Sequence, residues 1–240
     1  METENQPTVT SIPLTAIVLA GGRSSRMGQD KALLPIQGIP LLQMVCDVAQ
    51  GCASLVYVVT PWPERYQHLL PPTCQFIREV PLPRESAREV SLSSSSKMMP
   101  LPHGPLVGFA QGLAQVETEW VLLLACDLPR LRVEVLQAWA ARLNSVSQDV
   151  SALLPRHAKG WEPLCGFYRR SCLLGLTGFI NQGGRSFQQW LTQRSVGDAS
   201  GGALPQAQHS VQLLPLPEDD QMLFNCNTPA DLDAIRRNFC

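Results

Sequence analysis

Charge and long hydrophobic runs are both scarce in this sequence. Charged residues make up 16% of the 240 residues and the formal net charge is -1, so the chain lacks the basic surface that attracts nucleic acid or an anionic membrane. No apolar stretch approaches the roughly 20 residues that span a bilayer, and residues 1–12 are polar, without the positive start of a secretory signal. These absences predict a cytoplasmic protein with no nucleic-acid or membrane partner.

Paired metal-binding cysteines and two common phosphate-binding loops are also missing. The eight cysteines include no Cys-x-x-Cys pair, which predicts reduced, packed thiols rather than metal ligands or a disulfide framework. A Walker A loop requires Gly-Lys-Ser/Thr, whereas Gln29 and Asp30 separate Gly28 from Lys31, and the same region has no Gly-x-Gly-x-x-Gly. Neither of these loops therefore accounts for the glycines that the chain does have.

A different glycine-rich loop follows an apolar run at residues 14–20. It reads Leu-Ala-Gly-Gly-Arg-Ser-Ser-Arg-Met-Gly-Gln-Asp-Lys over residues 19–31. Two adjacent glycines at the carboxyl end of a strand let backbone N–H groups approach an anion or a nucleobase closely. Arg23, Arg26 and Lys31 add positive charge, which suits a polyphosphate. The alternative is a plain strand-to-helix turn with surface arginines.

Strand-like and helix-like segments alternate along the chain. Strands are predicted at 14–20, 55–60, 75–80, 120–126, 150–155 and 163–169, the last as a hairpin strand or an antiparallel addition, and helices near 40–50, 105–116, 133–143, 171–181 and 186–193. This order predicts an α/β fold: a Rossmann-like, doubly wound, mostly parallel sheet with helices on both faces. We expect one domain over residues 1–240. Five serines within residues 91–96 predict a flexible insertion at 82–103 rather than a domain boundary.

A carboxylate follows the predicted strand at 120–126. Asp127 stands at the carboxyl edge of the sheet, where open α/β folds bind ligands. A single carboxylate there suffices for Mg²⁺ when a triphosphate supplies further oxygens. The alternative is an N-cap for a helix beginning near residue 131, with Pro129 in its first turn. Beside the glycine-rich loop, we favour magnesium.

The glycine-rich loop resembles the signature of nucleotidyltransferases of the nucleotide-diphospho-sugar transferase type. Its double glycine is most similar to the molybdenum cofactor guanylyltransferase (MobA) family. Residues 104–108, 160–170, 184–187 and 224–232 also resemble segments of that family. Two positions depart from it: Thr60 or Pro61 stands where an Asn is expected, and Glu79, with Glu85 as a competitor, stands for the usual acidic residue after the third strand.

The resemblance implies transfer of GMP from GTP to the phosphate of molybdenum-bound molybdopterin, with release of pyrophosphate. It implies these roles: Arg26, Lys31 and Asp127 as catalytic residues; Leu19, Ala20, Gly21, Gly22, Lys31, Glu79 and Asp127 as GTP contacts; Asn225 and Asn227 as pterin contacts; and Asp127 as the Mg²⁺ ligand. The implied partners are the two substrates and proteins that deliver or accept the molybdenum cofactor. Alternatives are a CTP-dependent cytidylyltransferase, which typically has Leu-Ala-Ala-Gly, a sugar-phosphate nucleotidyltransferase, and a nucleotide-binding regulator without catalysis.

Overall fold

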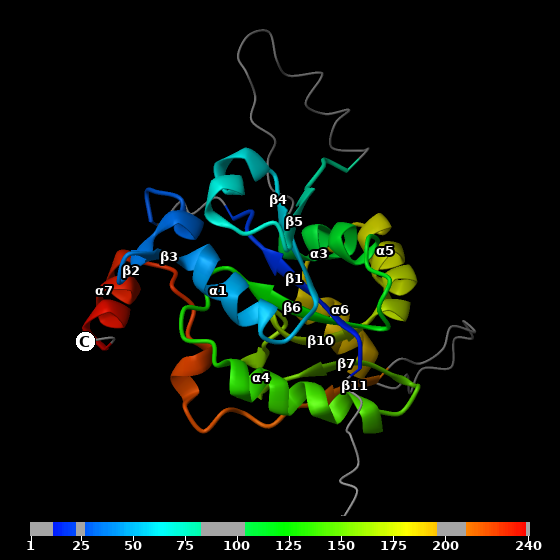
Figure 1. Cartoon of the computed structure of the whole chain (residues 1–240). Coiled ribbons are helices and arrows are strands. Elements are labelled where there is room, and N and C mark those ends of the chain that lie inside the picture. The colour runs from blue at the N-terminus through cyan, green and yellow to red at the C-terminus, as the bar shows by residue number, and fades with distance from the viewer. Residues whose placement is uncertain (1–11, 23–26, 83–103, 196–209, 239–240) are drawn as a thin grey trace, which may run out of the picture.

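A twisted seven-stranded sheet forms the centre of the molecule (Figure 1). The structure is a computed structural model that describes residues 12–22, 27–82, 104–195 and 210–238. The sheet has the order β11-β7-β10-β6-β1-β4-β5. Its strands are β1 (Leu14–Leu19), β4 (Leu55–Thr60), β5 (Cys74–Arg78), β6 (Trp120–Ala125), β7 (Val150–Leu154), β10 (Cys165–Arg169) and β11 (Ser210–Leu213).

The sheet is mostly parallel because the chain returns through helices between its central strands. Strand β1 pairs in parallel with β4 and β6, β4 pairs in parallel with β5, and β11 pairs in parallel with β7. Among the described strands of this sheet, β10 alone runs antiparallel to the rest, and it pairs with β6 and β7. Every residue of β1, β6 and β7 is buried, as expected for strands covered on both faces. The α/β prediction is therefore confirmed.

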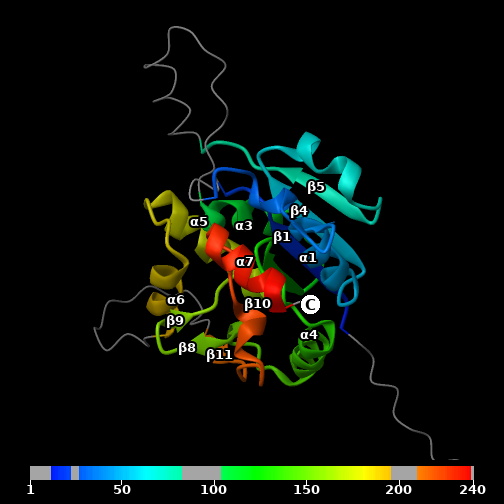
Figure 2. The ribbon, with the colours of Figure 1, turned by 90° about the vertical axis from the view of Figure 1, so that its left-hand side faces the viewer.

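Helices cover both faces of the sheet. They are α1 (Leu41–Gln50), α3 (Pro105–Leu113), α4 (Val133–Ala140), α5 (Leu173–Asn181), α6 (Phe187–Ser195) and α7 (Pro229–Asn238). One core cluster joins the sheet to α1 and α4, and a second joins the opposite face to α3, α5 and α6. A third cluster packs α7 and part of α1 against a small hairpin, β2 (Pro35–Ile36) and β3 (Ile39–Pro40). Figure 2 shows α7 at the centre, between α1 and the α5–α6 pair.

The structure adds elements that the sequence did not predict. Strand β11 extends the sheet at one edge, and a second hairpin, β8 (Arg156–His157) and β9 (Gly160–Trp161), precedes β10. None of the residues of β11 is fully buried, so the strand lacks the apolar run that marks β1 or β6. The antiparallel addition predicted at 163–169 is confirmed as β10. The insertion predicted at 82–103 lies outside the described residues apart from Leu82.

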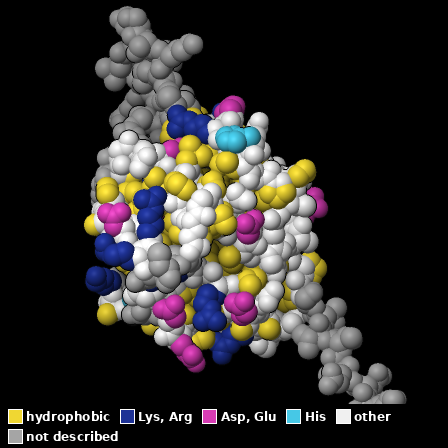
Figure 3. Space-filling model, turned by 60° about the vertical axis from the view of Figure 1, so that its left-hand side comes forward, with side chains coloured by type: hydrophobic (Ala, Val, Ile, Leu, Met, Phe, Trp, Pro, Cys, Tyr) yellow, Lys and Arg dark blue, Asp and Glu magenta, His cyan; other side chains and the backbone are white. Residues whose placement is uncertain are grey.

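The surface carries mixed charge. On the face in Figure 3, basic and acidic side chains are interspersed among hydrophobic and polar ones. Within the described residues, no helix is long and apolar enough to cross a membrane.

Candidate functional site

A cleft with a volume of about 460 Å³ lies where the parallel strands β1 and β6 end. It is lined by the loop after β1 (Leu19, Ala20, Gly21, Gly22), Asp30, Lys31 and Ala32, Val59 of β4, Glu79 after β5, Gly104, Pro105 and Gly108 at the start of α3, Ala125, Cys126 and Asp127 after β6, Leu164, and Asn225 and Asn227 before α7. Most of the predicted site residues therefore meet in one place, at the sheet edge where α/β folds bind ligands.

Close packing explains the first glycine of the loop. A Cβ atom on Gly21 would lie 3.0 Å from Glu79 Oε2 and 3.0 Å from Pro61 Cδ, so a side chain there would displace the carboxylate or the proline. Glu79 is buried, with 7% of its surface exposed, and its side chain also lies close to Gly108. A Cβ atom added to Gly108 would lie 3.5 Å from Glu79 Oε2. Gly22 has no described atom within 4 Å of the equivalent position. Gly21 thus makes room for Glu79, while Gly22 leaves the cleft open.

A helix N-terminus forms the wall beside Glu79. Gly104 has φ +90°, a conformation that favours glycine, and Pro105 occupies the first turn of α3. The first N–H groups of a helix lack intrahelical partners and attract anions. This wall can therefore bind an anionic or hydrogen-bond-accepting part of a ligand.

Three predicted residues from distant segments meet through one ammonium group. Lys31 Nζ donates hydrogen bonds to Asp127 Oδ2 and to Asn227 Oδ1, each at 2.8 Å. The side chains of Lys31 and Asp127 are both 15% exposed, so their ion pair is partly shielded from water. The backbone also joins these segments, because Cys226 N donates to Asp127 O at 2.9 Å. The contact brings the glycine-rich loop, the end of β6 and the C-terminal segment together.

Asp30 and Tyr66, which the sequence did not single out, position Lys31. Asp30 caps the short 3-10 helix η1 (Lys31–Leu33) through a 3.1 Å hydrogen bond from Ala32 N to its Oδ1. Its Oδ2 accepts a 2.7 Å hydrogen bond from the buried Tyr66 hydroxyl. Burial, and then the hydrogen bond to Asp30, raise the pKa of Tyr66, so Tyr66 remains a neutral donor. The signal in the sequence was an Asp directly before the Lys, which is typical of an N-cap.

Asp127 has the free coordination capacity that a divalent cation requires. Its Oδ1 is shielded from solvent and receives no hydrogen bond from the described residues, which is costly for a carboxylate. The helix-cap alternative for Asp127 is wrong: the N-cap residue of α4 is Arg132, and Pro129 lies before the helix. The position and chemistry of the Asp127 carboxylate therefore fit the role of a Mg²⁺ ligand. Within the described residues, no three His, Cys, Asp or Glu side chains form a complete metal site.

The segment before α7 is held by a reciprocal capping pair. Asp231 Oδ2 accepts hydrogen bonds from the backbone N–H groups of Asn227 and Thr228 at 2.9 and 2.7 Å, and Asp231 N donates to Thr228 Oγ1 at 3.2 Å. Thr228 and Asp231 thus form a capping box at the start of α7. Asn227 reaches Lys31, whereas Asn225 donates to Leu223 O at 3.3 Å within its own turn. Both asparagines line the cleft.

A family model and several relatives match the chain. The model of the MobA-like NTP transferase domain covers residues 16–196. The chain belongs to this family. It is 59% identical to a probable molybdenum cofactor guanylyltransferase of Trichormus variabilis over 94% of this chain and 92% of that protein. The resemblance inferred from the glycine-rich loop is therefore confirmed, and the chain is a nucleotidyltransferase.

Solved structures share the fold of this MobA-like chain. Molybdopterin-guanine dinucleotide biosynthesis protein A of Archaeoglobus fulgidus superimposes with a TM-score of 0.67 at 20% identity, covering 94% of this chain and 98% of that one. A Mycobacterium tuberculosis protein crystallised with manganese gives a TM-score of 0.60 at 14% identity, covering 94% and 98% of the two chains. At these identities the comparisons establish the architecture alone.

Arg26, predicted to be catalytic, lies outside the described residues, as does Glu85, the competitor of Glu79. Thr60, at the position where an Asn was expected, is fully buried, and its hydroxyl accepts a 3.2 Å hydrogen bond from Trp62 N. Thr60 thus stabilises the turn after β4, while Glu79 lines the cleft.

Cysteines at this MobA-like site are not poised as nucleophiles. Burial, and then the charge of Asp127, raise the pKa of Cys126, and burial raises the pKa of Cys226 to about 11. Both remain thiols near pH 7, and the nucleophile of cysteine chemistry is the thiolate. The seven described cysteines form no disulfide with one another and are at least partly buried, as expected of packed thiols.

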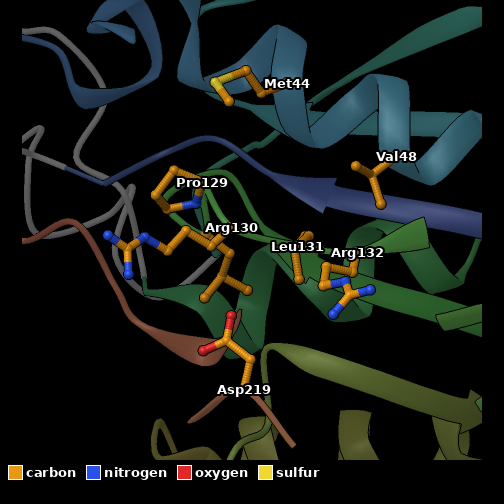
Figure 4. Close-up of a pocket in the computed structure, with 8 residues that line it drawn as sticks. Met44, Val48, Pro129, Arg130, Leu131, Arg132 and Asp219 are labelled. Carbon is orange, nitrogen blue, oxygen red and sulfur yellow. The ribbon is translucent and has the colours of Figure 1, made fainter. Parts of the chain in front are cut away.

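A second pocket, of about 420 Å³, lies outside this site. Met44 and Val48 of α1 form its upper wall in Figure 4, and residues 129–132 form its middle. Asp219 points into it from the opposite side. None of the predicted site residues lines this pocket, so we assign the chemistry of the MobA-like chain to the cleft.

Proposed function

We propose that the protein transfers GMP from GTP to the phosphate of molybdenum-bound molybdopterin and releases pyrophosphate. The observation that supports this proposal most strongly is the contact of Lys31 with Asp127 and Asn227. It joins the glycine-rich loop to the end of β6 and to the C-terminal segment. The names of the related proteins support this choice of reaction. GTP and molybdenum-bound molybdopterin are the substrates, the proteins that deliver or accept the cofactor are the expected partners, and the compartment is the cytoplasm.

GTP occupies the end of the cleft formed by β1, β5 and α3. The backbone of Leu19, Ala20, Gly21 and Gly22 lies against the ribose and the base. Glu79 accepts hydrogen bonds from the ring N–H and amino group of guanine, since its carboxylate reaches the cleft beside Gly21. Cytosine lacks that pair of neighbouring donors, so a carboxylate here favours GTP over CTP.

The reaction needs alignment and neutralisation of charge rather than a general base. A phosphate monoester has a second pKa near 6, so the acceptor is already anionic at pH 7. One of its oxygens forms a bond to the α-phosphorus of GTP, and the bond from that phosphorus to the bridging oxygen breaks as pyrophosphate leaves. Lys31, with Arg26, neutralises the phosphates during this step.

Asp127 holds the divalent cation, Mg²⁺ in this proposal. When bound, Mg²⁺ polarises the phosphoryl group and stabilises the charge that develops on the leaving oxygen. Asp127 supplies the carboxylate, and Lys31 moves from Asp127 Oδ2 to the triphosphate when the nucleotide binds. The hydrogen bond of Lys31 to Asn227 lets Asn227 orient the acceptor beside the same phosphates.

The deciding experiment measures pyrophosphate release with purified molybdenum-bound molybdopterin and each of GTP, CTP and ATP. We expect turnover with GTP to exceed that with CTP and ATP by at least tenfold, as lost charge-assisted hydrogen bonds to guanine predict. Equal or better turnover with CTP would favour the cytidylyltransferase alternative. Binding of GTP without pyrophosphate release would favour the regulator.

We also propose that residues 1–240 form one domain with an insertion at 82–103. Two hydrogen bonds hold the backbone of Val80 against α3. Val80 N donates to Gln111 Oε1 at 2.9 Å, and Val80 O accepts from Gln111 Nε2 at 2.8 Å. About 10 Å of helix separate Gln111 from Gly104, so a linker of a few residues spans the gap. Replacing 84–102 with such a linker should change the melting temperature little, whereas a large loss would mean that the segment belongs to the core.

A further inference from the structure

The β8–β9 hairpin carries a carboxylate that the proposed chemistry does not use. Glu162 follows β9, and its side chain is 30% exposed. His157 Nε2 lies 3.7 Å from Glu162 Oε1, beyond hydrogen-bond distance, and none of the described side chains donates a hydrogen bond to this carboxylate. The neighbouring cation, Arg156, lies over the ring of Trp161 instead, at 5.1 Å. The carboxylate oxygens of Glu162 can therefore accept hydrogen bonds from a ligand at a position that is partly shielded from water.

Backbone hydrogen bonds hold Glu162 beside the cleft. Glu162 N donates to Pro155 O at 2.9 Å, and Leu164 O accepts from Ala125 N at 2.9 Å. Leu164 lines the cleft, and the Cα atoms of Glu162 and Leu164 are at most about 7 Å apart. Glu162 thus lies near the end of the cleft opposite to Glu79.

The two carboxylates lie on either side of the phosphate-binding residues. Glu79 follows β5 and Glu162 precedes β10, and the sheet order places β4, β1 and β6 between them. Four steps between neighbouring strands span about 19 Å. Asp127 follows β6 and Lys31 follows the β1 loop, so both belong to the middle of this span. A product with a diphosphate at its centre and one ring system at each end matches this layout.

Guanine and pterin present the same hydrogen-bonding edge. Each contains a 2-amino-4-oxopyrimidine ring, in which a ring N–H stands beside the N–H of the amino group. A carboxylate accepts both hydrogen bonds, one on each oxygen. An enzyme that joins these two ring systems can therefore bind each of them through one carboxylate, one at each end of the cleft.

We propose that Glu162 recognises the pterin ring of the acceptor by accepting hydrogen bonds from its ring N–H and its 2-amino group. The inference rests on the proposed function, since it takes molybdopterin as the acceptor. The neighbouring His157 leaves the carboxylate able to accept these hydrogen bonds, because its Nε2 lies 3.7 Å from Oε1. A purely structural role for the pair is weak, because the two side chains are too far apart for a hydrogen bond.

The first test compares wild type with Glu162→Gln in steady-state pyrophosphate release. The amide keeps the size of the side chain but cannot accept two hydrogen bonds from the ring. We expect the KM for molybdopterin to rise about 10- to 100-fold, with the KM for GTP and the melting temperature unchanged. Glu134→Gln, on the exposed surface of α4, is the matched control and should leave all three unchanged. An unchanged KM for molybdopterin in Glu162→Gln would overturn the inference.

A second test needs no turnover. It measures binding of 6-carboxypterin and of 6-carboxylumazine, which has oxygen in place of the 2-amino group, to wild type and to Glu162→Gln. Wild type should bind the pterin at least tenfold more tightly, and the variant should lose this preference. A wild type that does not distinguish the two compounds, or a variant that keeps the preference, would overturn the inference. If the preference holds but molybdopterin and GTP give no pyrophosphate, the proposed function fails and the pterin site stands.

Discussion

The two ends of the cleft are built in different ways. The proposed nucleotide end consists of backbone from one continuous loop, residues 19–22, together with Glu79 and the start of α3. The proposed acceptor end consists of side chains from segments far apart in the sequence: Asn227 is 196 residues from Lys31, and Asp127, where the two ends meet, is 96 residues from it. A continuous loop is visible in a sequence as a motif. An end assembled by the fold is visible only once the topology is known.

This difference gives the two ends different sensitivities to mutation. Backbone contacts survive most side-chain changes, so the nucleotide end depends on space, as at Gly21 beside Glu79. The acceptor end depends on individual polar groups. Lys31 and Asp127 lie where the two ends meet, so changes there should affect both substrates and give the largest effects.

Asp127→Asn should give the largest loss. The substitution keeps the size of the side chain and its hydrogen bond with Lys31, but it removes the charge that a divalent cation requires. We expect turnover to fall by roughly a thousandfold, since a metal ion contributes several kcal/mol to phosphoryl transfer. The measurement is pyrophosphate release as a function of magnesium concentration, beside a melting curve.

The matched control for this prediction is Asp149→Asn. Asp149 is an exposed carboxylate that precedes β7, at the opposite edge of the sheet from the cleft. It should keep wild-type activity. The melting temperature of Asp127→Asn should stay within a few degrees of wild type, because the amide oxygen still accepts the hydrogen bond from Lys31 Nζ. A fully active Asn variant that still responds to magnesium would rule out the metal role of Asp127.

Lys31→Ala should give the next largest effect and should act on both ends. Its ammonium binds Asp127 and Asn227 here and the triphosphate in the proposed reaction. Losing one charge-assisted contact costs about 1.5–3 kcal/mol, or 10- to 100-fold in kcat/KM for GTP. Arg142→Ala, which removes an exposed cation far from the cleft, should keep wild-type kinetics. Unchanged kinetics in Lys31→Ala would make the residue a structural partner of Asp127 and no more.

The two asparagines separate the acceptor end from the nucleotide end. Asn227→Ala removes a contact with Lys31, so we expect the KM for molybdopterin to rise about tenfold while the KM for GTP changes less than threefold. Asn225→Ala removes a hydrogen bond within a turn and should raise the KM for molybdopterin less. The measurement is the pair of KM values for each variant. Equal effects on both substrates would mean that Asn227 acts through Lys31 alone.

The sequence predicts the nucleotide end better than the acceptor end for a physical reason. Strands β1 and β6 are buried on both faces, so each is a continuous apolar run followed by its functional residues. Strand β11 escapes prediction because its residues are half-buried or exposed. Local signals also leave Asp127 ambiguous, since a cap and a metal ligand both follow a strand. The structure excludes the cap, because residues 128–132 separate Asp127 from α4, which begins at Val133.

The contact between Lys31 and Asn227 shows the same limit. The sequence contains the capping pair of Thr228 and Asp231, which is local, and it contains both partners of the contact. Their meeting depends on α7 packing against the β2–β3 hairpin through buried residues such as Leu232 and Ile235. No spacing in the sequence encodes that docking. The capping pair predicts the start of α7 but not what its preceding segment touches.

Asp231 should give the smallest effect on activity, because it holds the acceptor end only indirectly. Its burial alone would raise its pKa, but hydrogen bonds from Asn227 N, the Thr228 hydroxyl and Thr228 N lower the pKa below its ordinary value. A carboxylate with a lowered folded-state pKa stabilises the protein above its unfolded pKa of about 3.9 and loses that contribution as the pH falls through the folded value.

Asp231→Ala should therefore lower stability by about 0.5–2 kcal/mol at pH 7, and the difference from wild type should shrink below about pH 4. Melting curves of both proteins from pH 3 to 8 measure this, with the KM for molybdopterin rising less than in Asn227→Ala. A difference that is constant down to pH 3 would show that the cap does not depend on the ionised carboxylate, and a larger KM effect than in Asn227→Ala would place Asp231 itself at the acceptor end.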